Sequence, residues 1–304
     1  MFVVKHRKIF YTISGVFFVA SLISLAVWGL NLGVDFKGGT LLEFSYPSGR
    51  PSLESVNRAL EPLKIGSLSV RPAGENSYIL RSNPLDEATH QAVLESLVID
   101  GKVVEEVQFS SIGPVLGRES AFKSLWAIFF VLVAIILFIT YAFRKVSAPV
   151  SSWKYGSMAI IGLIHDIIIP IGVFSVLGNF KGTEIDALFV TAVLVVLGYS
   201  IHDKIVVFDR VRENLKLDYG SKGSDFETIV GNSIKQTLVR SINTSVSTLL
   251  ALFALYFLGP TATQPFSLVL IIGIIAGTYS SIFIASPLLV TVEKWQRNKL
   301  VSRK

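Results

Sequence analysis

An aspartate inside an apolar stretch is the residue of this sequence whose chemistry is most out of place in a membrane. Asp203 lies within residues 194–208, where apolar residues both precede and follow it. A carboxylate inside a membrane span carries a free-energy penalty of about 2.5–3.5 kcal/mol, so it normally faces protein or water and serves a function. We therefore take Asp203 as a candidate functional residue. A structural ion pair, or a position at a helix end, is the alternative.

Arg240 is the candidate partner of this carboxylate. It opens the next apolar stretch, and an arginine in that position is ordinarily an anchor at the cytoplasmic surface. Two observations favour an ion pair with Asp203 instead: the carboxylate needs a partner, and polar residues continue beyond the arginine. These polar residues are Ser241, Asn243, Thr244, Ser245, Ser247 and Thr248.

His165 and Asp166 form a second polar pair, early in an apolar stretch that also contains Pro170. Adjacent residues of a helix point about 100° apart, so the two side chains cannot serve one partner in the same way. A functional role and a polar pair near the lipid headgroups, followed by a proline kink, both remain open.

Motifs of known enzyme classes are missing from the sequence. It has no Walker loop, no dinucleotide-binding fingerprint, no His-Glu-x-x-His and no Gly-x-Ser-x-Gly. The absence of cysteine excludes disulfides and thiolate chemistry. The two His-Asp pairs lie in separate stretches, and the other histidines, His6 and His90, lie elsewhere. We predict no catalytic residue, no metal site and no cofactor.

The elements that must position these residues are membrane spans. Half of the chain is hydrophobic (51%), only 16% is charged, and mean hydropathy is +0.59. The apolar residues come in runs long enough to cross about 30 Å of hydrocarbon. Six spans are predicted, at residues 9–30, 125–143, 155–177, 185–208, 242–258 and 266–292. In the last of these, the spacing of Gly273 and Gly277 is typical of close helix packing.

Lysine and arginine near the ends of the spans predict the orientation. They gather at the N-terminus, between spans 2 and 3, between spans 4 and 5, and in the tail, and the sequence carries a net charge of +6. This placement indicates membrane topology and no affinity for nucleic acid. Both termini are predicted to be cytoplasmic. The expected domains are 1–30, an extracytoplasmic segment 31–120, the spans of 121–292 and a basic tail 293–304.

The extracytoplasmic segment has its own pattern of periods. Strand-like alternation and helical spacing follow one another in the order βαββαβ. The elements are expected at residues 40–46, 52–63, 68–71, 78–81, 83–97 and 102–110. The predicted fold is a membrane all-α bundle of six transmembrane helices, with a small α+β ferredoxin-like domain between helices 1 and 2.

The sequence Gly-Val-Asp-Phe-Lys-Gly-Gly at residues 33–39, just outside span 1, resembles a motif of the SecD/SecF family of protein-translocase subunits. Its marking residues are Gly33, Asp35, Phe36, Gly38 and Gly39, and we expect the glycines to give the outer domain a flexible attachment. Further stretches match the SecF branch in the family order, over essentially the whole chain. They lie at residues 112–119, 163–166, 184–186, 198–214 and 237–245.

The resemblance implies a function in protein export. Members pair with SecD, resemble transporters of the resistance-nodulation-division type, and associate with the SecYEG channel, YajC, YidC and the translocating preprotein. They lie in the bacterial inner membrane and use the proton motive force. Asp203 matches the family's proton-carrying aspartate and Arg240 its partner. His165, Asp166, Asn243 and Thr244 are secondary polar residues of the membrane.

The chain departs from the family pattern around Asp203. Where the family usually has Asn-Asp-Thr or Asn-Asp-Ser, this sequence has His202-Asp203-Lys204. His202 thereby joins the proton-coupling candidates. Lys204 either competes with Arg240 for the carboxylate or extends to the headgroups, so the coupling ion, H⁺ or Na⁺, stays open. A proton-driven small-molecule exporter and a passive membrane scaffold are the rival functions.

Overall fold

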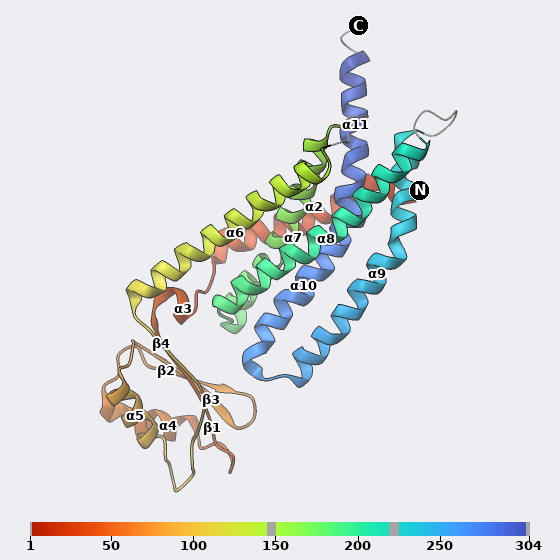
Figure 1. The fold of residues 1–304 in the computed structure, drawn as a ribbon. Coiled ribbons are helices and arrows are strands. Elements are labelled where there is room, and N and C mark those ends of the chain that lie inside the picture. Colours follow the sequence, from red (N-terminus) through yellow and green to blue (C-terminus); the bar gives the residue numbers. More distant parts are fainter. Residues whose placement is uncertain (1, 145–149, 219–224, 302–304) are drawn as a thin grey trace. The chain divides into compact units, whose positions relative to one another are not determined.

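The computed structural model describes residues 2–144, 150–218 and 225–301, and these divide into two compact units (Figure 1). The helical unit comprises Met1–Asn31, Ala127–Thr183 and Leu188–Lys304. The sheet unit comprises Leu32–Trp126 and Glu184–Ala187. Four of the basic residues behind the predicted orientation, Lys145, Lys222, Arg303 and Lys304, lie outside the described residues.

A four-stranded antiparallel sheet forms the centre of the sheet unit. Its strands lie in the order β2-β3-β1-β4. A bulge between Glu43 and Phe44 shifts the register between β1 and β4. The strand bounds are β1 Gly39–Ser45, β2 Ser69–Ala73, β3 Ser77–Ser82 and β4 Glu105–Ile112.

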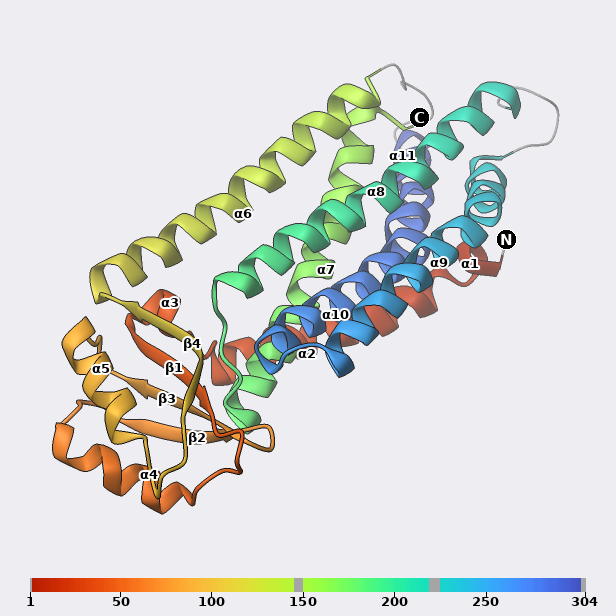
Figure 2. The same ribbon diagram turned by 60° about the horizontal axis from the view of Figure 1, so that its bottom comes forward.

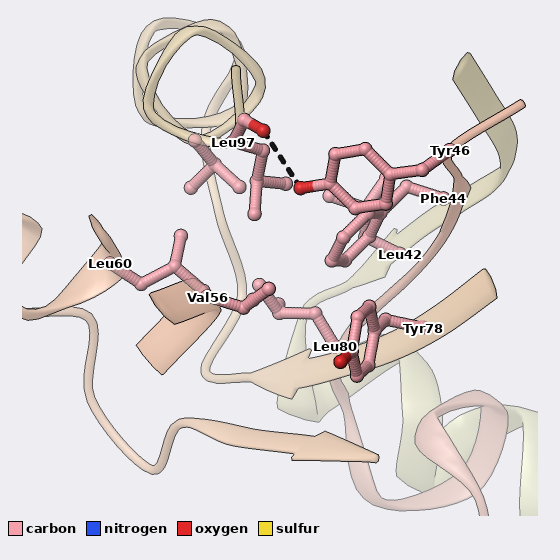
Figure 3. Close-up of a cluster of buried hydrophobic side chains, with 9 residues drawn as sticks. Leu42, Phe44, Tyr46, Val56, Leu60, Tyr78, Leu80 and Leu97 are labelled. Carbon is pink, nitrogen blue, oxygen red and sulfur yellow. Dashed lines mark hydrogen bonds between the residues drawn. The ribbon is translucent and has the colours of Figure 1, made fainter. Parts of the chain in front are cut away.

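Two short helices, α4 (Leu53–Leu60) and α5 (Glu87–Ser96), complete the core of this unit. Leucine and aromatic side chains alternate along β1 and β3, so that they share one face of the sheet and meet the helices there (Figure 3). The fully packed cluster consists of Leu42, Phe44, Tyr46, Val56, Leu60, Tyr78, Leu80, Val93 and Leu97. The buried phenol of Tyr46 donates a 2.7 Å hydrogen bond to the carbonyl oxygen of Leu97.

The element order β1-α4-β2-β3-α5-β4 is the predicted βαββαβ order, while several boundaries differ. The strand expected at residues 68–71 continues to Ala73 and so includes Pro72, which is tolerated because β2 is an edge strand of the described sheet. The second helix begins at Glu87 rather than beside Pro84. Asp86 caps it by accepting a hydrogen bond from the backbone N–H of Thr89, at 2.9 Å.

Within the described residues, six helical segments are long and apolar enough to cross a membrane, as predicted. Short elements flank them: α1 Phe2–Lys5, α3 Val34–Lys37, and 3₁₀ turns at Glu61–Leu63 and Thr261–Thr263. The long helices are α2 Arg7–Trp28, α6 Pro114–Ala142, α7 Ser152–Lys181, α8 Ala187–Asp218, α9 Phe226–Leu258, and α10 Gln264–Ser280 continued by α11 Ser286–Val301.

Most of these helices extend beyond their apolar stretches. The predicted connection between spans 4 and 5 is largely helical, so that Arg210 lies on α8 and Lys235 on α9. Helical hydrogen bonding continues into the polar sequence because it needs no apolar environment. Between α10 and α11, Ser281–Ala285 form a π-helical turn, which the sequence pattern did not indicate.

Burial differs strongly among the six helices. Half of the most apolar window is buried in α7 and in α8, against 6% in α6 and 11% in α9. α7 packs against α2 and α10, and α10 packs against α9 (Figure 2). A Cβ on Gly273 would lie 2.3 Å from the side chain of Val196, which confirms the predicted close packing at this glycine. The interior of the helical unit is therefore formed mainly by α7, α8 and α10.

Candidate functional site

A buried ion pair occupies this interior. Asp166 of α7 and Lys204 of α8 both have no exposed side-chain surface, and Lys204 Nζ lies 2.7 Å from Asp166 Oδ2. Ser280, the last residue of α10, donates to the same carboxylate oxygen at 2.7 Å. Ser200, one helical turn before Lys204, also donates to it. The carboxylate thus has its charge and its hydrogen bonds satisfied inside the protein.

The ammonium group of Lys204 is equally well satisfied. Its three hydrogen-bond acceptors are Asp166 Oδ2, Ser200 Oγ and Ser280 Oγ, the last at 2.8 Å. Gly162 of α7 makes room for the lysine side chain, because a Cβ there would lie 2.4 Å from Lys204 Cε. This packing fixes the lysine within the interior, which excludes the predicted extension to the headgroups.

His165 links this cluster to a cavity. Its Nδ1 lies 2.9 Å from Asp166 Oδ1, whereas its buried Nε2 has no hydrogen-bond partner among the described residues. The cavity, of about 350 Å³, is lined by His165 together with apolar side chains of α2, α7 and α10, and by Ser14 and Tyr279. The imidazole therefore contacts both the ion pair and an apolar space.

Asp203 lies on α8 beside the lysine but is bound quite differently. Only 4% of the residue is exposed, and its Oδ2 has no hydrogen-bond partner among the described residues. The buried hydroxyl of Ser241 on α9 is a close polar neighbour of this carboxylate, but no hydrogen bond of normal geometry joins Ser241 to Asp203 among the described residues. The positive charge of Lys204 acts on Asp203 more strongly than that of Arg240, and no salt bridge joins Asp203 to Arg240 in the described part of the chain. Asp203 is thus a buried carboxylate without full compensation.

The glycine motif lies in the sheet unit, at the junction of α3, β1 and α6. The backbone N–H of Gly33 donates to the carbonyl oxygen of Ile185 at 2.8 Å. Asp35 accepts a hydrogen bond from the backbone N–H of Ala187, also at 2.8 Å. Phe36 is buried, at 5% exposure. The motif thereby binds the segment that immediately precedes α8.

Two glycines of this motif are required by close contacts, while the predicted flexibility of the attachment stays a prediction. Gly38 and Gly39 have φ values of 80° and 130°, which favour glycine. A Cβ on Gly38 would lie 2.6 Å from Cα of Pro114, and one on Gly39 would lie 2.9 Å from the carbonyl oxygen of Ser82. Any other residue at these two positions would be strained or would clash.

An ion pair accompanies the motif in the same unit. Arg81 Nη1 lies 3.1 Å from Glu184 Oε1. Burial raises the pKa of Glu184 above its ordinary value, although the positive charge of Arg81 acts in the opposite direction. Burial likewise lowers the pKa of Arg81. The pair is therefore partly desolvated and less favourable than an exposed one of the same length.

Comparisons with known proteins identify the family of this chain. The family described as protein export membrane protein SecD/SecF, C-terminal, matches residues 93–295, and the SecD/SecF GG motif matches residues 23–46. The protein translocase subunit SecF of Thermobaculum terrenum is 42% identical, over 96% of this chain and 93% of its own length. The chain belongs to the SecF family of protein translocase subunits. The SecF of Anaerolinea thermophila is 38% identical, over 96% of this chain and 94% of its own.

Solved structures of SecDF share the fold. The crystal structure of SecDF from Thermus thermophilus, titled a translocon-associated membrane protein, matches with a TM-score of 0.79 at 30% identity. The match covers 96% of this chain and 38% of the SecDF chain. SecDF in a super-membrane-facing form matches with a TM-score of 0.68 at 28% identity, covering 40% of that chain. This SecF-family chain thus spans less than half the length of each SecDF chain.

Within this SecF-family chain, the predicted site residues fall into two groups. His165 and Asp166 contact each other, whereas Asp203 and Arg240 are not joined. The remaining predicted residues are exposed on their helices: His202 on α8, and Arg240, Asn243 and Thr244 on α9. The proton-coupling role of Asp203, Arg240 and His202 stays a prediction.

Three residues of the buried cluster escaped the sequence analysis as partners of Asp166: Ser200, Lys204 and Ser280. One signal was present for two of them. Ser200 and Lys204 are four residues apart, so they share a face of α8. A lysine and a carboxylate that both lie within apolar stretches are also expected to form an ion pair. Nothing in the sequence indicated Ser280.

Proposed function

We propose that this chain works with a SecD subunit to couple the proton motive force to protein export through the SecYEG channel, with Asp203 as the protonation site. One observation carries this proposal: of the two buried membrane carboxylates described above, Asp166 is neutralised by Lys204 while Asp203 has an oxygen without a partner. A carboxylate that is buried and incompletely bound is the one whose charge state is easiest to change.

The physical cycle follows from removing one charge. A proton arriving from outside neutralises Asp203 and removes its electrostatic interaction with Arg240. The helices α8 and α9 then repack, and proton release on the inside restores the interaction. One charge crossing 100 mV yields about 2.3 kcal/mol, and each pH unit adds about 1.36 kcal/mol. This is enough to shift the populations of two conformations substantially.

The exposed polar side of α9 supports a second membrane subunit. Arg240, Asn243, Thr244 and Ser247 are exposed there, among apolar residues that are also exposed, such as Val239 and Val246. Thr244 and Ser247 donate to backbone carbonyl oxygens of their own helix, but the guanidinium of Arg240 and the amide of Asn243 would lack hydrogen-bond partners in hydrocarbon. A SecD subunit covering this side would provide them, as the coverage of only 38% of a SecDF chain also suggests.

We further propose that both termini are cytoplasmic and that the sheet unit is an extracytoplasmic ferredoxin-like module. The strand order β2-β3-β1-β4 and the βαββαβ sequence support the module. Because the chain has no cysteine, single-cysteine labelling tests the orientation cleanly. Glu75→Cys should react with an impermeant reagent in intact spheroplasts, and Asn298→Cys only after the membrane is opened. The reverse pattern would contradict the proposal.

Export in inverted membrane vesicles tests the function. With SecD and SecYEG present, Asp203→Asn should abolish the stimulation of export by the proton gradient while protein level and SecD association stay normal. Asp209→Asn is the matched control, because Asp209 is an exposed carboxylate of the same helix. Arg240→Lys keeps the charge but loses the planar guanidinium, so partial stimulation is expected.

His202→Asn separates the two titratable neighbours. If Asp203 carries the proton, this variant should shift the pH optimum of stimulation and keep the coupling. If instead Asp203→Asn still stimulates export and still responds to the gradient, Asp203 is structural, and a passive scaffold is the better description of this chain.

A further inference from the structure

Three side-chain oxygens from three helices converge on one buried point. They are Asp166 Oδ2 of α7, Ser200 Oγ of α8 and Ser280 Oγ of α10, and each of these residues has a relative exposure of 0%. One carboxylate and two hydroxyls supply oxygen ligands with a single negative charge. Small hard cations prefer oxygen ligands, and membrane transporters bind such ions in buried sites between helices.

The ammonium group of Lys204 occupies the space between these three oxygens. Lys204 Nζ lies 2.7 Å from Asp166 Oδ2 and 2.8 Å from Ser280 Oγ, and it also donates to Ser200. An ammonium has three N–H donors, and all three have acceptors here. The lysine is therefore bound as a monovalent cation would be, with its charge balanced by one carboxylate.

The residues around the site leave space for the Lys204 side chain. Gly162 leaves the space through which the lysine side chain passes, since a Cβ at that position would lie 2.4 Å from Lys204 Cε. Directly after Ser280 the chain forms the π-helical turn Ser281–Ala285, in which Ser286 donates to the carbonyl oxygen of Ser281 at 2.7 Å. Such turns are frequent where a helix must place a side chain at a site.

We propose that Asp166, Ser200 and Ser280 form a monovalent-cation site whose resident cation is the ammonium of Lys204. The tethered ammonium excludes Na⁺ from this position and keeps Asp166 out of ion exchange. The inference concerns a different carboxylate from the one assigned to proton transfer. It stands whether or not Asp203 couples export to the gradient.

Removing the ammonium should expose the site. In the full-length chain in detergent, Lys204→Ala leaves the three oxygens and adds space for an ion. Its Tm should rise with Na⁺, by about 3 °C for each tenfold increase above the dissociation constant, with choline as the inert control. The variant should also retain ²²Na⁺ on the purified protein saturably. The wild type should show neither effect, and Asp166→Asn in the Lys204→Ala background should abolish both.

Lys294→Ala is the matched lysine control. Lys294 forms an ion pair with Glu227 but is partly exposed, so its removal opens no buried site. Na⁺ should therefore not change the Tm of that variant. The proposal is overturned if Lys204→Ala shows no saturable response to Na⁺ beyond that of Lys294→Ala. It is equally overturned if the wild type retains ²²Na⁺ in a manner that depends on Asp166, a measurement that remains decisive should Lys204→Ala fail to fold.

Discussion

The two units of the molecule are built on opposite principles. The sheet unit has an apolar interior, in which Leu42, Phe44 and Leu80 are fully buried. The helical unit buries a charged pair, Asp166 and Lys204 at 0% exposure, while apolar side chains such as Leu137 are 65% exposed. The sheet unit buries apolar groups, which water solvates poorly. The helical unit buries charged groups, which hydrocarbon cannot solvate.

This difference determines what holds each unit together. In the sheet unit, removing apolar surface from water supplies the main driving force. In the helical unit, lipid is as apolar as leucine, so packing and internal polar contacts must stabilise the arrangement. The Asp166–Lys204 pair is such a contact, and Asp203 lacks its equivalent. Four groups of substitutions test this comparison, ordered by the largest effect expected within each group.

Replacing Asp166 by asparagine should have the largest effect. It leaves the ammonium of Lys204 buried without a counter-charge, which costs about 3–5 kcal/mol of unfolding free energy. Reversible unfolding of the full chain in detergent micelles measures the loss. The double variant Asp166→Asn/Lys204→Met removes both charges and should recover most of it. A double variant as unstable as Asp166→Asn would contradict the importance of the pair.

The same leucine-to-alanine change should act very differently in the two units. Leu42→Ala removes a fully buried side chain of the sheet unit and should lower its unfolding free energy by about 2–5 kcal/mol. Leu137→Ala on α6 changes an exposed side chain that faces lipid or detergent, and it should cost less than about 0.5 kcal/mol. Limited proteolysis of the sheet unit and detergent unfolding measure the two changes. Equal effects would mean that α6 is covered by protein.

Asp225 at the start of α9 should show an intermediate effect that depends on pH. It accepts a hydrogen bond from the backbone N–H of Thr228 at 2.9 Å, so Asp225→Ala should cost about 0.5–2 kcal/mol. Hydrogen bonds from Thr228 lower the pKa of this carboxyl below its ordinary value of 3.8. Its stabilisation is therefore complete above pH 3.8 and is lost as the pH falls through the lowered pKa.

Unfolding midpoints between pH 7 and pH 2.5 check this dependence. The gap between wild type and Asp225→Ala should stay constant near neutrality and narrow at the acid end. Asp86 caps α5 of the sheet unit in the same way, and hydrogen bonds from Thr89 lower its pKa too. The difference in unfolding midpoint between wild type and Asp86→Ala should narrow over the same pH range. A gap that widens in acid would contradict the assignment of both caps.

Asp203→Asn should have a smaller effect on stability than the changes at Asp166 and Asp225. No ion pair or hydrogen bond to Oδ2 is lost, so the unfolding free energy should change by less than about 1 kcal/mol. Paired with Asp166→Asn in one unfolding experiment, it compares two buried carboxylates of the same interior. A loss as large as that of Asp166→Asn would show that Asp203 is held by contacts within this chain.

Much of the fold followed from periodicity and length alone. Six apolar runs gave six spans, and alternating and helical periods gave the order of strands and helices in the sheet unit. Buried faces impose these periods on the sequence, so they can be read without knowing any contact. The ends of the elements could not be read as well: α5 begins at Glu87 behind its cap Asp86 rather than at residue 83, and such a boundary depends on local hydrogen bonds.

The sequence by itself also marked Asp203 and the His165–Asp166 pair, since a charge in an apolar run is visible at once. Only the tertiary structure decided which of the two aspartates, Asp166 or Asp203, forms an ion pair. Lys204 follows Asp203 directly in the sequence, but adjacent side chains on a helix point about 100° apart. The rotation of α8 against α7 and α10 turns Lys204 toward Asp166 and Ser280. That rotation is set by packing at positions such as Gly162, where the absence of one side chain leaves room for another.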